Sequence, residues 1–400
     1  SSSSGNSNNS IYPSSNDYIS IGVNANKKGL KNSWRIHESL AYLDKRKSNI
    51  QAIAEEGFYE DNFNFLWQFN GASWQQNTDH WTIANRVSMR DVNGNELENQ
   101  DAVGNYTSAI FKYNDCLPIA IATNARYKEV LNENFDHYQF QNSINPNIDD
   151  INNELAIQSF VDFQSIVDES NSQISFSGDY AHSGVYSLLI PPNNSVNILF
   201  KTEDEYEFEC NETGSFEEDE NLQRSRSLTT ECENEFFGIT CDKCIPYNVF
   251  EGGKEYFASL WVATEQSINS GLFSSNFDFE IGVGGTIITI PKIGIPVDGW
   301  QKYEGYFTPS TIHDFLQMLF IVPAGEPVHY IDDFRIHPSN SYMMSYVYDP
   351  FSLRLLAELD ENNFATFYEY NEEGILVRTK VETERGVKTI SESRNEITPN

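Results

Sequence analysis

The stretch Tyr346-Val-Tyr348-Asp349 recurs 22 residues further on as Tyr368-Glu-Tyr370-Asn371. In each copy two tyrosines stand at alternate positions, an Asp or Asn follows them, and an alternating apolar run comes next. Alternate spacing places both tyrosines on one face of a β-strand, and the Asp or Asn opens a turn. The repeat therefore predicts consecutive antiparallel β-hairpins near the C-terminus, with an ordinary β-meander as the alternative.

Size and charge restrict the classes of protein and partner. The chain has 400 residues, too many for one compact core, so two or three domains are expected. The net charge is −33, from 26 Lys and Arg against 59 Asp and Glu. This charge would repel nucleic acid and anionic membranes, so neither is expected as a partner. No apolar run approaches the roughly 18 residues of a transmembrane helix, and no membrane span is predicted.

Four of the five cysteines, Cys210, Cys232, Cys241 and Cys244, lie within 35 residues of each other in an acidic segment. The last two have the two-residue gap of a zinc ribbon, but the first two stand 22 apart and supply no second close pair. Two disulfides are therefore favoured over zinc, with three pairings open, and they would imply an extracellular, oxidising compartment. The remaining Cys116 is expected to be buried as a small apolar side chain.

Both flanks of the chain contain distinctive motifs. The N-terminal flank contains Glu96-Leu-Glu98-Asn99, Gly104-Asn-Tyr106 and Asn124-Ala-Arg126-Tyr127. The C-terminal flank contains Tyr368, Tyr370, Asn371, Gly374 and Leu376, with Glu382-Thr-Glu-Arg385-Gly386 after them. These motifs resemble segments of large secreted or cell-surface proteins of Bacteroidetes that carry RHS (YD) repeats, and the resemblance implies a hairpin scaffold.

Both flanks also show similar hairpin patterns. Two hairpins alone would be only marginally stable in water and would leave an exposed sheet edge. The tyrosine repeats at 346–380 are therefore predicted to form hairpins that continue a sheet begun by residues 85–130.

The segment between the flanks contains five blocks in this order: Asn134-Phe135-Asp136, Tyr180-Ala-His182-Ser183-Gly184, Gly253-Lys254-Glu-Tyr256, Gly299-Trp300 and Tyr330-Ile-Asp332-Asp333-Phe334. Together these blocks resemble a galactose-binding-like jelly roll, the sandwich of many carbohydrate-binding modules. Apolar and polar residues alternate around these blocks, and Gly or Pro separates them, which is typical of a β-sandwich.

The predicted fold class is mainly β, with a β-sandwich jelly roll inserted between RHS-like antiparallel hairpin segments. The predicted division is a linker at 1–30, an N-terminal β-rich RHS-like segment at 31–133, a jelly roll at 134–338 with a Cys-rich acidic insertion at 203–248, and YD-repeat-like hairpins at 339–400. The Ser- and Asn-rich opening is interpreted as a flexible linker, either within a longer polypeptide or at the start of a mature chain. Residues 39–54 show partly helical spacing, whereas 63–69 alternate as a strand.

The jelly-roll resemblance also implies a structural Ca²⁺ ion, which prefers hard oxygen ligands. By motif, Asp136 and one of Asp332 or Asp333 would supply carboxylates, with main-chain carbonyls near residues 182–184. In an alternating strand only one of Asp332 and Asp333 can face inward, and a buried carboxylate needs a cation or several hydrogen-bond donors. The alternative is a solvated pair of aspartates at a turn.

Sugar binding by the sandwich would require exposed aromatic rings. Trp261 and Trp300 are the candidate glycan-binding residues, although core packing is favoured for both. No nucleophile elbow, zinc-protease helix, phosphate-binding loop or dinucleotide fingerprint occurs in the sequence, so enzymatic activity is not predicted.

The predicted function is a non-enzymatic structural or interaction scaffold at a bacterial cell surface, forming the C-terminal part of a larger secreted protein. Its expected partners are other surface or outer-membrane proteins, and glycans. Two alternatives stay open at this point: a carbohydrate-binding adhesin module and a fragment of an RHS-type toxin shell. Exposed aromatic rings on one face of the sandwich would favour the adhesin, whereas a long upstream repeat array would favour the shell.

Overall fold

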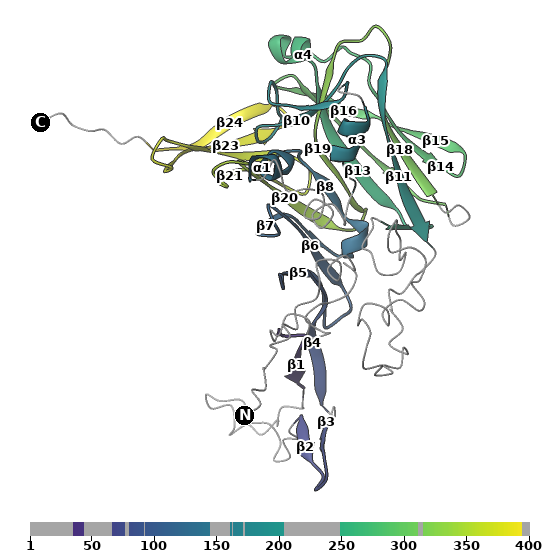
Figure 1. The fold of residues 1–400 in the computed structure, drawn as a ribbon, viewed down its shortest axis with the longest axis vertical. Coiled ribbons are helices and arrows are strands. Elements are labelled where there is room, and N and C mark those ends of the chain that lie inside the picture. The colour runs from purple at the N-terminus through teal and green to yellow at the C-terminus, as the bar shows by residue number, and fades with distance from the viewer. Residues whose placement is uncertain are drawn as a thin grey trace, which may run out of the picture.

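The computed structural model describes residues 35–43, 66–76, 80–91, 93–144, 161, 163–170, 173–203, 249–310 and 315–393. Its main parts are a ten-stranded antiparallel sheet and a two-sheet sandwich (Figure 1). The cysteines of the predicted disulfides, Cys210, Cys232, Cys241 and Cys244, lie outside the described residues.

The ten-stranded sheet contains strands from both ends of the chain. In spatial order they are β1 (Glu38–Tyr42), β4 (Trp81–Arg90), β5 (Glu96–Asp101), β6 (Tyr106–Lys112), β7 (Leu117–Thr123), β20 (Tyr342–Tyr348), β21 (Leu355–Leu359), β22 (Ala365–Tyr370), β23 (Leu376–Thr383) and β24 (Gly386–Glu392). β7 pairs directly with β20, with Thr123 opposite Tyr342 and Ala120 opposite Ser345. The predicted C-terminal hairpins and the shared sheet of the two flanks are therefore confirmed.

Four hairpins of this sheet turn in the same way, at Asp91, Asp101, Asp360 and Asn371. The side-chain oxygen of each accepts the main-chain N–H four residues on, and its carbonyl accepts the N–H three residues on. The third residue after the Asp or Asn has a positive φ, which favours Gly. Gly occupies this position in three of the turns, and Asn363 occupies it in the fourth.

The sandwich is inserted between β7 and β20. Its larger sheet has the order β16 (Lys292–Val297), β17 (Trp300–Phe307), β13 (Tyr256–Ala263), β19 (His329–Pro338), β10 (Ser187–Ile190) and β9 (Ser175–Ser177), with β8 (Leu131–Glu133) also paired to β19. Its smaller sheet has the order β12 (Val249–Glu251), β11 (Asn194–Glu203), β18 (Phe315–Val322), β14 (Asp278–Val283) and β15 (Thr286–Ile290). Inward-facing residues of both sheets, including Leu260, Phe320 and Phe334, form one buried core, which confirms the predicted sandwich.

Helices are few and short among the described residues. They are the 3-10 turn at Tyr127–Glu129 and the helices α1 (His137–Ile144), α3 (Phe163–Glu169) and α4 (Glu265–Ser270). In the part of the chain that the structure describes, no helix is long and apolar enough to cross a membrane.

Two sequence-based predictions about local structure are wrong. The predicted helix at 39–54 begins as a strand, because β1 pairs with β4 and Tyr42 packs edge-on against Trp81; residues 44–54 lie outside the described part. Cys116 is exposed rather than buried. It closes the turn between β6 and β7, where Tyr113 and the two residues after it all have positive φ.

The tryptophans spaced seven apart lie on three different strands. Trp67 belongs to β2 (Trp67–Phe69), Trp74 to β3 (Trp74–Gln76) and Trp81 to β4. β2 and β3 form a separate two-stranded hairpin. Residues 67–69 of the strand predicted at 63–69 therefore form β2, whereas residues 63–65 lie outside the described part.

Candidate functional site

The outer face of the larger sandwich sheet packs against the hairpin sheet. Trp261 and Trp300 lie in this interface with Phe364 and Val387 of the hairpins. The indole N–H of Trp261 donates to the main-chain carbonyl of Asn363 at 2.9 Å. Trp261 and Trp300 are 1% and 6% exposed, so neither of these glycan-binding candidates can stack on a ligand.

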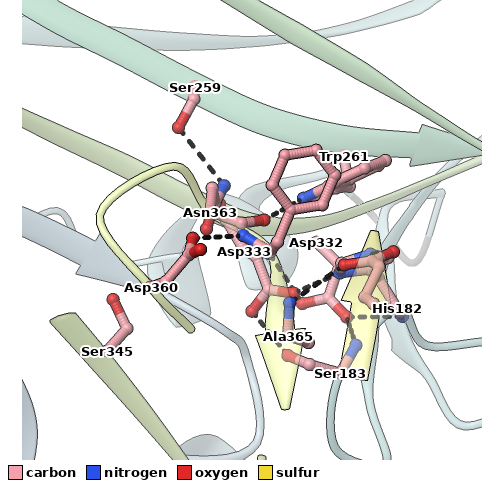
Figure 2. A network of polar contacts seen from close by, with 12 residues as sticks. His182, Ser183, Ser259, Trp261, Asp332, Asp333, Ser345, Asp360, Asn363 and Ala365 are labelled. Carbon is pink, nitrogen blue, oxygen red and sulfur yellow. Dashed lines mark hydrogen bonds and ion pairs between the residues drawn. The ribbon is translucent and has the colours of Figure 1, made fainter. Parts of the chain in front are cut away.

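His182 forms the centre of a buried polar network in this interface (Figure 2). Its Nδ1 lies 2.7 Å from Oδ2 of Asp333 in the sandwich, and its Nε2 lies 2.9 Å from Oε1 of Glu382 in β23. Burial alone would lower the pKa of His182, but the charge of Glu382 and the hydrogen bonds to Asp333 and Glu382 outweigh it and raise the pKa to about 9. The ring is therefore an imidazolium at neutral pH, with each N–H donating to a carboxylate.

The adjacent aspartates Asp332 and Asp333 both accept hydrogen bonds from the loop at 182–183, although strict alternation along a strand would direct neighbouring side chains to opposite faces of the sheet. The pairing of β13 with β19 explains this: Ser259 is opposite Arg335 but Trp261 is opposite Asp332, so β19 contains one extra residue. Asp333 has a φ of 48° at this bulge. The expectation that only one of the two could face inward is therefore wrong.

Both aspartates accept hydrogen bonds from the segment at 182–184, which the sequence analysis predicted to lie near them. The main-chain N–H groups of His182 and Ser183 donate to Oδ2 of Asp332 at 2.8 and 3.2 Å. The hydroxyl of Ser183 donates to Oδ1 of Asp333 at 2.6 Å. The loop thus contributes N–H and O–H donors to these carboxylates.

Asp136 is the third predicted metal residue, and it contacts the same loop. Its Oδ1 accepts the main-chain N–H groups of Val185 and Tyr186 at 2.9 and 3.1 Å, whereas its buried Oδ2 has no hydrogen-bond partner. Burial raises the pKa of Asp136 well above its usual range. A Cβ atom on Gly184, which has a φ of 77°, would lie only 2.1 Å from Oδ2 of Asp136.

The structure therefore brings Asp136, Asp332 and Asp333 to one loop, but protein donors satisfy most of their oxygens. Among the described residues, no group of three or more His, Cys, Asp or Glu side chains could hold a metal ion. Oδ2 of Asp136 is the carboxylate oxygen of this set that is left for a cation. Calcium binding stays a prediction.

The turn that carries Asn363 is held by three strands of the sandwich. Its side-chain amide donates to the hydroxyl of Ser259 at 3.2 Å (Figure 2). The guanidinium of Arg335 and the ammonium of Lys302 donate to main-chain carbonyls of residues 360–362. One feature of the sequence indicated this contact: Asn363 occupies the turn position that Gly occupies in the other three turns.

An open cleft is lined by β15 of the smaller sheet and by β13, β16 and β17 of the larger sheet. It has a volume of about 430 Å³, and Phe257, Ile293, Glu304 and Tyr306 are among the residues that line it. Tyr306 is 59% exposed, and its ring centroid lies 5.2 Å from that of Phe257. Oε2 of Glu304 lies 2.5 Å from the ammonium of Lys302.

Comparison with known proteins gives structural similarity only. The sequence matches no protein-family model and no curated protein. The CBM22-1 xylan-binding domain of Paenibacillus barcinonensis Xyn10C is 13% identical, over 41% of this chain and 80% of that domain, with a TM-score of 0.24. A family 16 carbohydrate-binding module is 9% identical, over 41% of this chain and 84% of that module, with a TM-score of 0.23. Values this low do not indicate a ligand for this chain.

Proposed function

We propose that this chain is a non-catalytic module that binds a glycan in the cleft at Phe257 and Tyr306. The observation that supports this proposal is the exposed ring of Tyr306 beside Phe257, with a carboxylate in the same cleft. The C–H groups of a pyranose pack well on an aromatic face, and a carboxylate accepts hydrogen bonds from sugar hydroxyls. The cleft volume of about 430 Å³ falls within the usual range for small-ligand sites.

The composition of the cleft supports binding rather than hydrolysis. Among the described residues that line it, Glu304 is the one acid, and it is ion-paired with Lys302. Hydrolysis of a glycosidic bond generally uses two carboxyl groups on opposite sides of that bond. Glu304 is therefore assigned to ligand binding.

The test uses the full chain and begins with a glycan array, followed by calorimetry on each positive oligosaccharide. Tyr306→Ala should weaken binding at least tenfold, because the stacking ring is lost. Tyr342→Ala is the matched control, since Tyr342 is 69% exposed on β20 and does not line the cleft. Equal affinities for the two variants, or an array without positive signals, would contradict the proposal.

A scaffold function is the second candidate, favoured by the one sheet that joins β7 to β20. In this interpretation the hairpins hold the sandwich in a fixed orientation at an extracellular surface, where other surface proteins contact the assembly. Isolating the native complex from membranes and identifying its components would test this function. Recovery of the chain alone would argue against it.

A further inference from the structure

The hairpin of β2 and β3 carries three exposed aromatic rings. Trp67, Phe69 and Trp74 are 56%, 56% and 67% exposed. Phe69 lies directly opposite Trp74, and Trp67 lies directly opposite Gln76. Directly opposite residues of an antiparallel pair project from the same face, and so do residues two apart in one strand. All three rings therefore lie on one face of the hairpin, which we call the aromatic face.

The aromatic face has a defined shape. The rings of Phe69 and Trp74 contact each other, with centroids 5.5 Å apart. The turn between the strands is fixed by Asn70, whose Oδ1 accepts the main-chain N–H groups of Ala72 and Ser73 at 3.0 and 2.9 Å. The turn and the ring contact therefore place Phe69 and Trp74 beside each other on the aromatic face.

The hairpin also lies apart from the other described elements. In Figure 1 it occupies the lower end of the molecule, far from the strands of the sandwich. β2 and β3 pair only with each other in the described part of the chain. A two-stranded hairpin is only marginally stable in water, and clustered exposed aromatic rings mark a binding surface rather than a packing surface.

The chemistry of the hairpin restricts the partner. Residues 66–76 read LWQFNGASWQQ and contain no charged side chain, in a chain whose net charge is −33. Apart from Ser73, the polar side chains of this stretch are amides, with Gln68 and Gln75 on the opposite face and Gln76 on the aromatic face. Amides both donate and accept hydrogen bonds, which suits hydroxyl groups, whereas a charged partner would find no counter-charge.

We propose that the aromatic face binds a neutral polysaccharide, with sugar rings stacked on Trp67 and Trp74. This site is separate from the cleft at Tyr306 and does not depend on it. The spread of the rings over two strands suits an extended chain rather than a single sugar. The hairpin would give the protein a second contact with a polysaccharide surface and so raise its avidity.

The test measures depletion of the full chain from solution by three insoluble neutral polysaccharides: microcrystalline cellulose, xylan and chitin. Trp67→Ala and Trp74→Ala should each weaken binding at least tenfold, because each removes a stacking ring. Trp74→Tyr should bind within about threefold of the parent chain, since it keeps a ring opposite Phe69. Gln68→Ala is the control on the opposite face of the same strand, and its binding should be unchanged.

Other results would overturn the proposal. The first is the absence of binding to all three polysaccharides, and the second is unchanged binding by Trp74→Ala. Sedimentation with phosphatidylcholine vesicles that Trp74→Ala abolishes would assign the face to a lipid surface, and a dimer that Trp74→Ala dissociates would assign it to a second copy. Tyr306→Ala should reduce binding of soluble oligosaccharides but leave a Trp74-dependent part of polysaccharide binding, which separates failure of this site from failure of the cleft.

Discussion

Nε2 of His182 lies 2.9 Å from Oε1 of Glu382, although 200 residues separate them in the chain. His182 belongs to the loop before β10 in the sandwich, and Glu382 belongs to β23 in the hairpin sheet. The other carboxylate oxygen of Glu382 accepts the main-chain N–H of Ala365 at 3.0 Å. Removing one member of a buried charge network is strongly destabilising, because it leaves an uncompensated charge. This contact therefore couples the orientation of the sandwich to the hairpins.

Stability should fall as the pH rises through the pKa of His182. The pKa is about 9 in the folded chain against roughly 6.5 when unfolded, so the stabilisation is complete below about pH 6.5 and is lost as the pH rises through 9. The difference corresponds to roughly 3 kcal/mol. Urea unfolding of the parent chain, His182→Gln and the surface control His37→Gln at pH 6 and pH 9.5 measures this effect.

His182→Gln should be less stable than the parent at pH 6 and should lose less stability on going to pH 9.5. His37→Gln should behave like the parent, because His37 is half-exposed. Burial also raises the pKa of Asp136 and Asp332. Their ionisation therefore lowers the stability of the folded chain as the pH rises, as the loss of the His182 proton does. The difference between the two variants isolates the contribution of His182, and equal pH dependence would contradict its role.

The turns and the alternation of the strands could be predicted from the sequence, because both depend on residues close together in the chain. Asp or Asn opens each turn and a small residue with positive φ closes it. The convergence of Asp136, Asp332 and Asp333 could be predicted only by resemblance to a known sandwich. Their hydrogen-bond partners depend on the loop conformation, which residue spacing does not determine.

The rest of the site depends on long-range packing. The bulge at Asp333 is a property of the pairing of β13 with β19, and no local pattern indicates it. Trp261 has the alternation of an outward-facing residue, but the hairpin turn at Asn363 covers it. Since the sequence does not show that this turn packs on the sandwich, it could not show whether the ring is exposed or buried.

Asn363→Gly should lower the free energy of unfolding by about 1–3 kcal/mol, because it leaves the buried hydroxyl of Ser259 and the main-chain carbonyl of Asp333 without their donor. Gly keeps the positive φ of the turn, so the backbone itself should not be strained. Gly104→Asn is the converse change in an exposed turn, where it should alter stability by less than about 1 kcal/mol. Thermal and urea unfolding measure both, and a neutral Asn363→Gly would exclude a stabilising role for its amide.

Calcium is predicted to stabilise the sandwich through Asp136, whose Oδ2 has no hydrogen-bond partner. A cation that binds only the folded chain raises the melting temperature by mass action, so a chelator should lower it and added calcium should restore it. Asp136→Asn should be insensitive to both treatments. An unchanged melting temperature of the parent chain in saturating chelator would rule the site out.

Gly184→Ala should be among the most destabilising single substitutions in the sandwich. Its Cβ would lie 2.1 Å from Oδ2 of Asp136 and 2.7 Å from Cγ1 of Val347, at a backbone φ of 77°. Gly271→Ala is the matched control, because Gly271 has a φ of 72° but no atom within 4 Å of a new Cβ. The control should cost about 1 kcal/mol from backbone conformation alone, whereas Gly184→Ala should cost about 3 kcal/mol or more.

The double variant Gly184→Ala with Asp136→Ala identifies the cause of that loss. If the clash with the carboxylate dominates, removing the carboxylate should recover part of the lost stability, and the two effects should be less than additive. Full additivity, or equal losses for Gly184→Ala and Gly271→Ala in urea unfolding, would show that the close approach of Gly184 to Asp136 does not control the packing of this loop.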